Sequence, residues 1–262
     1  MINSKIEWTH HTANLWWGCT KVHEGCDNCY ASTMAHRWGF DVWGNDKYRR
    51  EIKSVWKELK NYQKIASDLK MIHRVFVGSM MDVFEKPMPL IDSKRNIVSN
   101  KTTGDLRDKF FNEVVPSSPN LLFLLLSKRP SNINKYTPTP WKVEPPSNVM
   151  FGTSPVNQTT SVTLITQLQQ VNGRKFLSVE PQLSEITLLP WLTENKIDWV
   201  IQGGESGPHK RPFNTDWARK IKAECTATNT PYFFKQIDKK QAIPEDLLVR
   251  EFPTHLKLRS ME

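Results

Sequence analysis

Three of the chain's four cysteines lie within eleven positions, and thiols at this spacing could bind a metal. Cys19, Cys26 and Cys29 follow the pattern C-x6-C-x2-C, and a glycine directly precedes each of the first two. Glycines allow a loop to turn sharply enough for its sulfur atoms to converge. We therefore predict a metal site held by these three thiolates.

The identity of the metal stays open on this pattern, because no fourth cysteine lies nearby. Zinc takes four ligands in a structural site, so a histidine would complete the set. The histidines close enough in sequence are His10, His11, His23 and His36. A 4Fe-4S cluster held by three thiolates would instead leave one iron open to a substrate or cofactor. Free, buried thiols are a third interpretation.

Short apolar runs alternate with helical segments along most of the chain. The first run precedes the cysteines at 14–18, and the others cover 74–79, 121–126, 148–153, 175–179, 198–202 and 231–235. Such runs between helices are typical of βαβ units, whose strands are parallel. We predict an α/β fold, a partial or closed (β/α) barrel of about six or seven mainly parallel strands. A single domain over 1–262 is expected, with a helical excursion at about 40–70.

Helices are predicted at 28–38, between Asn157 and Gly173, and at about 215–228. Asn157 is the expected N-cap of the second helix. The face expected to pack on the sheet carries Val162, Leu164, Ile165, Leu168 and Val171. In the third helix, Cys225 shares a face with Trp217, Ala218 and Ile221, so we expect it in the core rather than at a metal.

Polar residues follow nearly every predicted strand at the same point of the cycle. Ligands of parallel α/β folds bind at the carboxyl ends of the strands, so these side chains should ring one site beside the cysteine loop. The ring comprises Ser79, Asp82, Lys128, Arg129, Ser154, Glu180, Gln202, Glu205, Lys235 and Gln236. The basic members could bind a carboxylate or phosphate, or could neutralise the acidic members. Asp82 could equally cap its own loop.

Two sets of candidate residues follow from this ring. The candidate catalytic residues are Lys128, Arg129, Glu180 and Lys235. The candidate cofactor-binding residues are Ser79, Ser154, Gln202, Gly203, Gly204 and Glu205. The paired glycines would let the backbone approach a ligand closely beside a carboxylate. His10 and His11 are expected at the surface.

The charge balance favours an anionic partner. The chain has 36 Lys and Arg against 27 Asp and Glu, a net charge of +9, which is compatible with a nucleic acid or nucleotide as substrate. Four cysteines do not form a secreted disulfide framework in a chain this long, and the first residues lack the apolar run of a signal peptide. No apolar segment approaches the length of a membrane span. We expect a cytoplasmic protein without a membrane partner.

Several short segments together resemble one family, the three-cysteine-motif proteins found often in phages and prophages, which in turn resemble radical S-adenosylmethionine enzymes. The segments run in one order along nearly the whole chain, at 6–9, 18–30, 79–84, 127–130, 177–181, 198–208 and 233–236. The last three contain Leu-Ser-Val-Glu-Pro, Gly-Gly-Glu-Ser-Gly and Phe-Phe-Lys-Gln. The loop departs from the usual C-x3-C-x2-C of those enzymes, since its first gap is six and Asn28 precedes the last cysteine.

The resemblance implies a function as well as a fold. It implies that Cys19, Cys26 and Cys29 hold a 4Fe-4S cluster that binds S-adenosylmethionine, and that an electron donor drives formation of a 5′-deoxyadenosyl radical in a partial barrel. Gly203, Gly204 and Glu205 could hold the amino group or ribose of this cofactor, or could instead form a glycine turn with a structural glutamate. A three-cysteine-motif partner protein is a further expectation. The alternative is a non-catalytic nucleic-acid-binding protein stabilised by zinc or a cluster.

Overall fold

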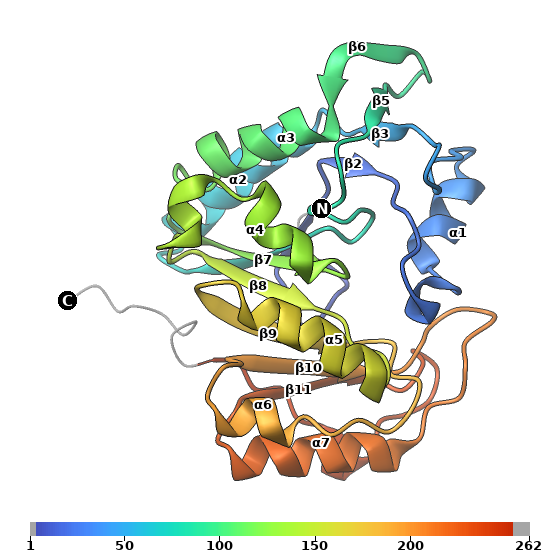
Figure 1. The fold of residues 1–262 in the computed structure, drawn as a ribbon, viewed down its shortest axis with the longest axis vertical. Helices are drawn as coiled ribbons and strands as arrows, with labels where there is room; N and C mark the ends of the chain where they lie inside the picture. Colours follow the sequence, from blue (N-terminus) through green and yellow to red (C-terminus); the bar gives the residue numbers. More distant parts are fainter. Residues whose placement is uncertain (1–3, 254–262) are drawn as a thin grey trace.

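The computed structural model describes residues 4–253, and its main sheet confirms the predicted fold class. Seven parallel strands lie in the order in which they follow one another along the chain, β1-β4-β7-β8-β9-β10-β11. The sheet does not close on itself, so it forms a half-barrel (Figure 1). Its strands are β1 (His11–Ala13), β4 (His73–Val77), β7 (Leu121–Ser127), β8 (Val149–Thr153), β9 (Arg174–Val179), β10 (Trp199–Gly203) and β11 (Tyr232–Gln236).

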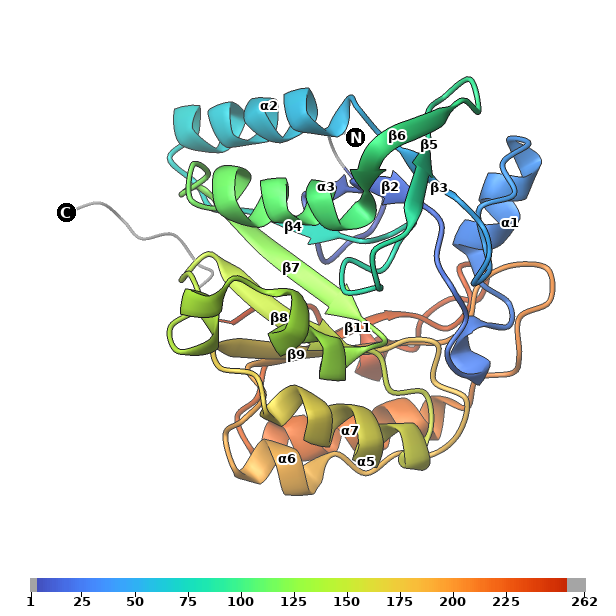
Figure 2. The ribbon, with the colours of Figure 1, turned by 45° about the horizontal axis from the view of Figure 1, so that its top comes forward.

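Helices cover the outer face of this sheet, as right-handed βαβ crossovers require. The covering helices are α2 (Val55–Asp68), α3 (Thr103–Lys109), α4 (Ile133–Tyr136), α5 (Gln158–Gln169), α6 (Leu189–Thr193) and α7 (Thr215–Ala227). A π-helical turn, Phe110–Val114, extends α3. Short 3-10 turns lie at Glu24–Cys26, Pro130–Asn132, Thr139–Lys142 and Glu245–Leu247. Helix α1 (Tyr30–Arg37) differs from these, because both ribbon views show it beside the carboxyl ends of the strands rather than over the sheet (Figures 1 and 2).

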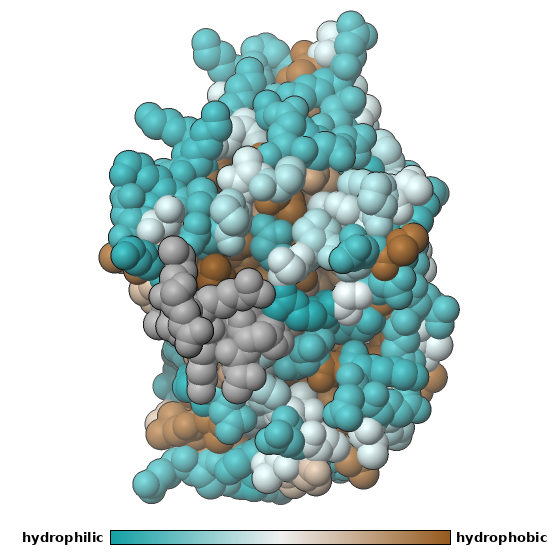
Figure 3. All heavy atoms as spheres, turned by 90° about the vertical axis from the view of Figure 1, so that its left-hand side faces the viewer, coloured by the Kyte–Doolittle hydropathy of each residue, from teal (hydrophilic) through white to brown (hydrophobic). Residues whose placement is uncertain are grey.

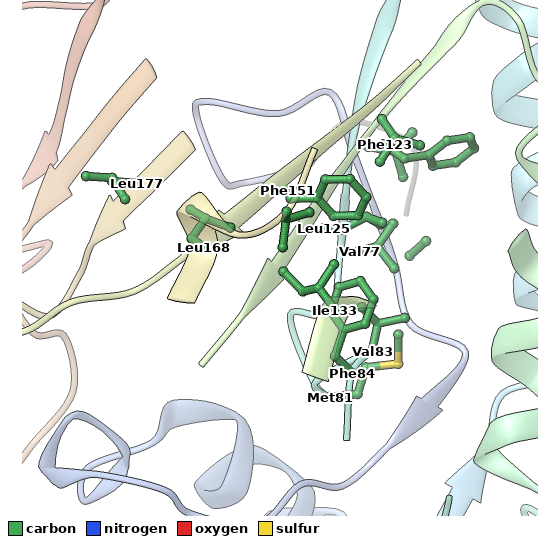
Figure 4. Close-up of a cluster of buried hydrophobic side chains, with 14 of the residues drawn as sticks. Val77, Met81, Val83, Phe84, Phe123, Leu125, Ile133, Phe151, Leu168 and Leu177 are labelled. Atoms are coloured by element: carbon green, nitrogen blue, oxygen red, sulfur yellow. The ribbon is translucent and has the colours of Figure 1, made fainter. Parts of the chain in front are cut away.

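The strands are apolar on both faces, which explains why they read as continuous apolar runs. Side chains alternate along each strand, so Val75 and Val77 pack outward against the helices while Phe76 points into the half-barrel. Figure 4 shows part of the outer cluster, which includes Phe84, Phe123 and Phe151. Burying this surface on two sides supplies the main driving force for folding.

The concave inner face is filled by residues from near both ends of the described chain. Trp8 lies against Phe76, with ring centroids 4.8 Å apart, and against Trp199 at 6.3 Å. Phe252 packs on Trp199 from the other side, at 5.4 Å. These aromatic rings cover the inner face of the sheet, which a closed barrel would bury against its own strands.

A second, smaller sheet corrects one prediction. It has the order β2-β3-β5-β6, with strands β2 (Trp16–Trp17), β3 (Arg49–Glu51), β5 (Pro89–Ile91) and β6 (Ile97–Thr102). The predicted first barrel strand at 14–18 is wrong, because Trp16 and Trp17 pair antiparallel with β3 in this sheet. The first strand of the barrel is instead β1, which lies just before this segment in the sequence. Of the predicted helical excursion at 40–70, only α2 is helical, and β3 lies within it.

The predicted helices are largely confirmed. Asn157 caps α5, since its side chain accepts a hydrogen bond from Thr160 N at 2.8 Å. Val162 is the exception on the predicted packing face, because it is half exposed while Leu164, Ile165, Leu168 and Val171 are buried. Cys225 is buried in the core, as expected.

The side of the molecule opposite α1 is mostly hydrophilic, with apolar residues in small, separate groups (Figure 3). Scattered apolar residues of this kind are normal on a protein surface. Among residues 4–253, none of the helices is both long and apolar enough to cross a membrane.

Candidate functional site

A cavity opens at the carboxyl ends of the strands, where the sequence pattern predicted a site. Its enclosed volume is about 190 Å³, and its mouth opens to solvent. The floor is apolar and the wall polar. The floor residues are Ile6, Trp8, Phe76 and Leu126, and the wall includes the three cysteines, Lys128, Arg129, Ser154, Glu180, Glu205 and Lys235.

The three cysteines of the loop all line this cavity, and none forms a disulfide. The loop departs from β2 at Gly18, whose φ of 116° favours glycine and where a Cβ would lie 2.3 Å from the carbonyl oxygen of Val42. Removal from water raises the pKa of the Cys19 thiol to about 12, with Asp82 adding to the rise and Arg129 opposing it. The Cys19 thiol therefore stays protonated until a cation binds it.

The described residues, 4–253, contain no group of three or more His, Cys, Asp or Glu side chains arranged to hold a metal ion. The donors themselves nonetheless suit an iron-sulfur cluster, because three free thiols of one loop face a single cavity. His23, one of the predicted zinc ligands, uses Nδ1 to accept a hydrogen bond from Gly25 N at 3.1 Å. Burial and the neighbouring Lys128 lower the pKa of His23 to about 4, so its ring is neutral.

A network of buried charges fixes the start of the cysteine loop. Arg129 donates to Asp82 at 2.9 Å and to the sulfur of Cys19 at 3.6 Å. Arg49 donates through Nε and Nη2 to the two carboxylate oxygens of Glu85, at 2.9 and 2.8 Å, and both side chains are at most 2% exposed. Arg49 also donates to Thr20 Oγ1 at 3.0 Å, one residue after Cys19. The first thiol is therefore positioned by ion pairs rather than by apolar packing.

A second network ties the end of the loop to the strand ends on the far side of the cavity. Asn28, the residue that departs from the radical-enzyme pattern, donates to Glu205 at 2.9 Å and to the carbonyl oxygen of His209 at 2.8 Å. Arg211 donates to both oxygens of Glu205, at 3.0 and 2.7 Å. Hydrogen bonds from Arg211 and Asn28 lower the pKa of Glu205 despite its partial burial. Glu205 thus holds the cysteine loop in place.

Glu180 and Lys235 form an ion pair inside the cavity, with Lys235 Nζ 2.5 Å from Glu180 Oε1. Glu180 directly follows β9 and Lys235 lies near the end of β11, 55 residues away in sequence. Both side chains are mostly buried, at 18% and 15% exposed, where an ion pair is strong but costly to desolvate. A zwitterionic ligand could exchange partners with such a pair without leaving either charge alone.

Some polar groups of cavity-lining residues have no partner within residues 4–253. The Lys128 ammonium is in no hydrogen bond or ion pair there, while its backbone N–H donates to Asp82 at 3.1 Å. Ser154 is fully buried, and neither its Oγ nor Trp8 Nε1 has a partner in this part of the chain. Buried polar groups are normally satisfied, so these atoms point to a ligand or water in the cavity.

The remaining predicted site residues separate into two groups. Ser79 and Gly204 line the cavity, and Ser79 is held there by a hydrogen bond from Asn14 Nδ2 to its Oγ at 2.8 Å. Gln202 and Gly203 are not among the lining residues. Gln202 is fully buried between Gln182 and Tyr232, to which its side-chain amide is hydrogen-bonded. Adjacent strand residues alternate between faces, so a strand-end position alone did not decide which side chain meets the cavity.

Sequence reasoning missed several residues of the site. Arg49 and Glu85, which anchor the cysteine loop, were not predicted as site residues, because neither lies at the end of a barrel strand. Tyr30 lines the cavity, and its hydroxyl donates to the carbonyl oxygen of Ser79 at 2.9 Å. Its position directly after Cys29 is the sequence feature that could have predicted its place in the cavity wall.

The prediction that His10 and His11 lie at the surface is wrong for His11, while His10 is partly exposed. His11 is buried, and its Nε2 lies 3.0 Å from Nδ1 of His73. His10 stacks on His73 with centroids 4.6 Å apart, and its Nδ1 accepts from Arg74 N at 2.9 Å. These rings lie where β1 and β4 start, away from the cavity, because β1 begins at His11.

Fold and site together define an α/β half-barrel protein with a cysteine-lined cavity at the carboxyl ends of its strands. The chain belongs to the family described as "Protein of unknown function (DUF5131)", whose model matches residues 3–245. No curated protein and no solved structure matches it.

Proposed function

We propose that this protein is a radical S-adenosylmethionine-type enzyme whose active site is the cavity. Cys19, Cys26 and Cys29 would hold a 4Fe-4S cluster. The observation that supports this most is that three free thiols of one loop share a cavity with ligand-seeking polar groups from several strand ends. Resemblance to the three-cysteine-motif proteins of phages adds to it.

The chemistry that such a cluster supplies when bound is one-electron cleavage of the sulfonium, which yields methionine and a 5′-deoxyadenosyl radical that takes a hydrogen atom from the substrate. The electron would come from a separate reduced donor protein. A partner protein of the three-cysteine-motif type and a cytoplasmic location are further parts of this proposal.

Residues of the chain would bind and orient the reactants. Lys128 would meet an anionic group of cofactor or substrate, and Ser154 would donate a hydrogen bond beside it, since both lack partners within residues 4–253. The Glu180–Lys235 pair would receive a zwitterionic group. The apolar floor around Trp8 and Phe76 would exclude water from a reactive intermediate.

Anaerobic purification followed by iron and sulfide analysis tests the proposal. We expect close to stoichiometric cluster with its visible absorption, and 5′-deoxyadenosine after addition of S-adenosylmethionine and a strong reductant. Cys26→Ala should abolish both. Cys225→Ala is the matched control, because this buried thiol lies outside the cavity, and it should keep both.

Two results would overturn the proposal. Tight zinc without iron or sulfide would support the rival function, a non-catalytic nucleic-acid-binding protein stabilised by zinc. A cluster that survives reduction with S-adenosylmethionine and yields no 5′-deoxyadenosine would leave cluster binding and remove the radical chemistry.

A further inference from the structure

Helix α1 exposes a row of large side chains that starts at the cavity. Tyr30, Met34 and Trp38 are 45%, 37% and 54% exposed and lie four residues apart, hence on one face. Tyr30 also lines the cavity. At 1.5 Å per residue the row is about 12 Å long, the length of about three or four stacked nucleotides at roughly 3.4 Å each.

The far end of this row is a stack of aromatic rings and arginines. Trp38 stacks on Trp17 with centroids 4.8 Å apart and planes at 25°. The Arg50 guanidinium lies 4.3 Å from the Trp17 ring centroid and 4.1 Å from that of Phe40. Arg95 lies 5.5 Å from the same Phe40 ring. We call the α1 row, the exposed Arg37 at the end of α1 and this stack the α1 platform.

The positive charge of the α1 platform is not neutralised within the described part of the chain. There, Arg37, Arg50 and Arg95 are in no ion pair, and Arg37 is exposed. Two carboxylates of adjoining loops are already engaged: Asp41 pairs with Lys47 at 2.7 Å, and Asp92 accepts from Asn96. An anionic polymer that carries planar rings complements both parts of the platform, because its rings can stack on the aromatic side chains and its charges can pair with the arginines.

We infer that the α1 platform binds single-stranded nucleic acid and delivers one base into the cavity. Stacking on Trp38 and Tyr30 would hold neighbouring bases, and Arg37 would contact the phosphates. Duplex would bind less well, because its bases are already stacked and cannot reach a recessed site unless they are flipped out. The inference deepens the proposed function, on which its catalytic meaning rests, by naming the substrate class.

Binding of fluorescein-labelled 12-nucleotide DNA and RNA, single-stranded and duplex, to the anaerobically purified full chain tests this inference. We expect single strands to bind more tightly than duplex, with affinity falling as salt rises. Trp38→Ala should weaken binding about 5- to 100-fold, and Trp38→Phe, which keeps a stacking ring, should restore most of it. Arg37→Gln should weaken binding and reduce the salt slope by about 0.7.

Leu69→Ala is the matched control, because this exposed side chain lies at the end of α2, outside the α1 platform. It should bind as the unmodified protein does. Absence of binding at low salt, preference for duplex, or undiminished binding by Trp38→Ala would each overturn the inference. Cluster content and 5′-deoxyadenosine formation are measured on the unmodified protein in the same preparation, so failure of this inference is distinct from failure of the proposed function.

Discussion

Lys128 differs from the other cations of the cavity wall because its ammonium has no partner within residues 4–253. Arg129 is paired with Asp82, and Lys235 is paired with Glu180. The energy that a paired cation gains from a ligand is reduced by the partner it already has. Lys128 is therefore the residue from which an anionic ligand gains most.

We predict that Lys128→Met weakens binding of the cavity's ligand about 10-fold or more without loss of folding, since a charged hydrogen bond contributes about 1.5–3 kcal/mol. Isothermal titration with S-adenosylmethionine, followed by urea unfolding, measures both. Lys60→Met, at an exposed site on α2, should change neither. Equal affinity in the Lys128 variant would show that its ammonium stays in solvent.

The histidines at the start of the barrel should make stability pH-dependent. Burial, Arg74, His73 and His11 lower the pKa of His10 from 6.5 to about 3. The unfolded chain then takes up a proton that the folded chain refuses, so the stabilisation is complete above about pH 6.5 and is lost as pH falls toward 3. We expect roughly 1 kcal/mol less stability from His10 near pH 5, allowing for its partial exposure.

Urea unfolding near pH 7.5 and near pH 5 measures this loss. His10→Asn is the informative variant, because its amide oxygen can accept the Arg74 N–H without titrating. It should show a smaller difference between the two pH values. An unchanged difference would assign the acid sensitivity to other groups, such as His73, whose pKa burial also lowers.

At the scale of elements, the cysteine loop is held at both ends by contacts to distant segments. Its start is fixed by Arg49 and Arg129, and its end by Asn28 on Glu205. A loop tethered in this way keeps its thiols oriented before any metal binds, which lowers the entropy cost of binding.

We predict that Arg49→Met destabilises the fold by about 3–5 kcal/mol, because it leaves the buried Glu85 carboxylate with only the longer ion pair to Arg129, at 3.8 Å. The iron content of the purified protein should fall with it, as the loop loses its anchor at Thr20. Arg219→Met is the matched control, since its ion pair with Asp246 is exposed, and a much smaller loss is expected. Similar losses in the two variants would contradict the anchoring role.

At the scale of the whole molecule, the half-barrel depends on aromatic rings from outside the sheet to cover its inner face. Trp8 and Phe252 belong to two such segments, one near each end of the described chain. Arg250, two residues before Phe252, pairs with Glu7, next to Trp8, at 2.9 Å and lies 4.6 Å from the ring centroid of Phe233. Arg74 lies 4.0 Å from the Phe252 ring centroid. The segments that carry Trp8 and Phe252 therefore contact each other as well as the sheet.

We predict that Trp8→Ala costs about 3–5 kcal/mol, because it empties the space between Phe76 and Trp199. Thermal unfolding should show a clearly lower Tm, and the enlarged floor should bind a hydrophobic fluorescent dye. Val143→Ala, at a highly exposed position, should leave Tm unchanged. A small effect of Trp8→Ala would mean that the inner face is closed by other residues.

The sequence alone determined the features that depend on short-range patterns. Apolar runs of strand length and helices with recognisable caps predicted an α/β barrel with parallel strands, partial or closed, because periodicity and capping act within a few residues. The rule that parallel strands present ligands at their carboxyl ends brought Lys128, Ser154, Glu180 and Lys235 to one predicted site, and all four line the cavity.

Only the tertiary structure decided which of those side chains are hydrogen-bonded or ion-paired within the protein and which can bind a ligand. Asn28 and Glu205 are 177 residues apart, and no local pattern links them. Gln202 turned away from the cavity and His11 was buried for the same reason, since burial and hydrogen-bond partners come from segments that meet only in the fold. Trp8 shows this most clearly: the sequence marks it as a large apolar residue, and only the open edge of the half-barrel makes it the floor of the site.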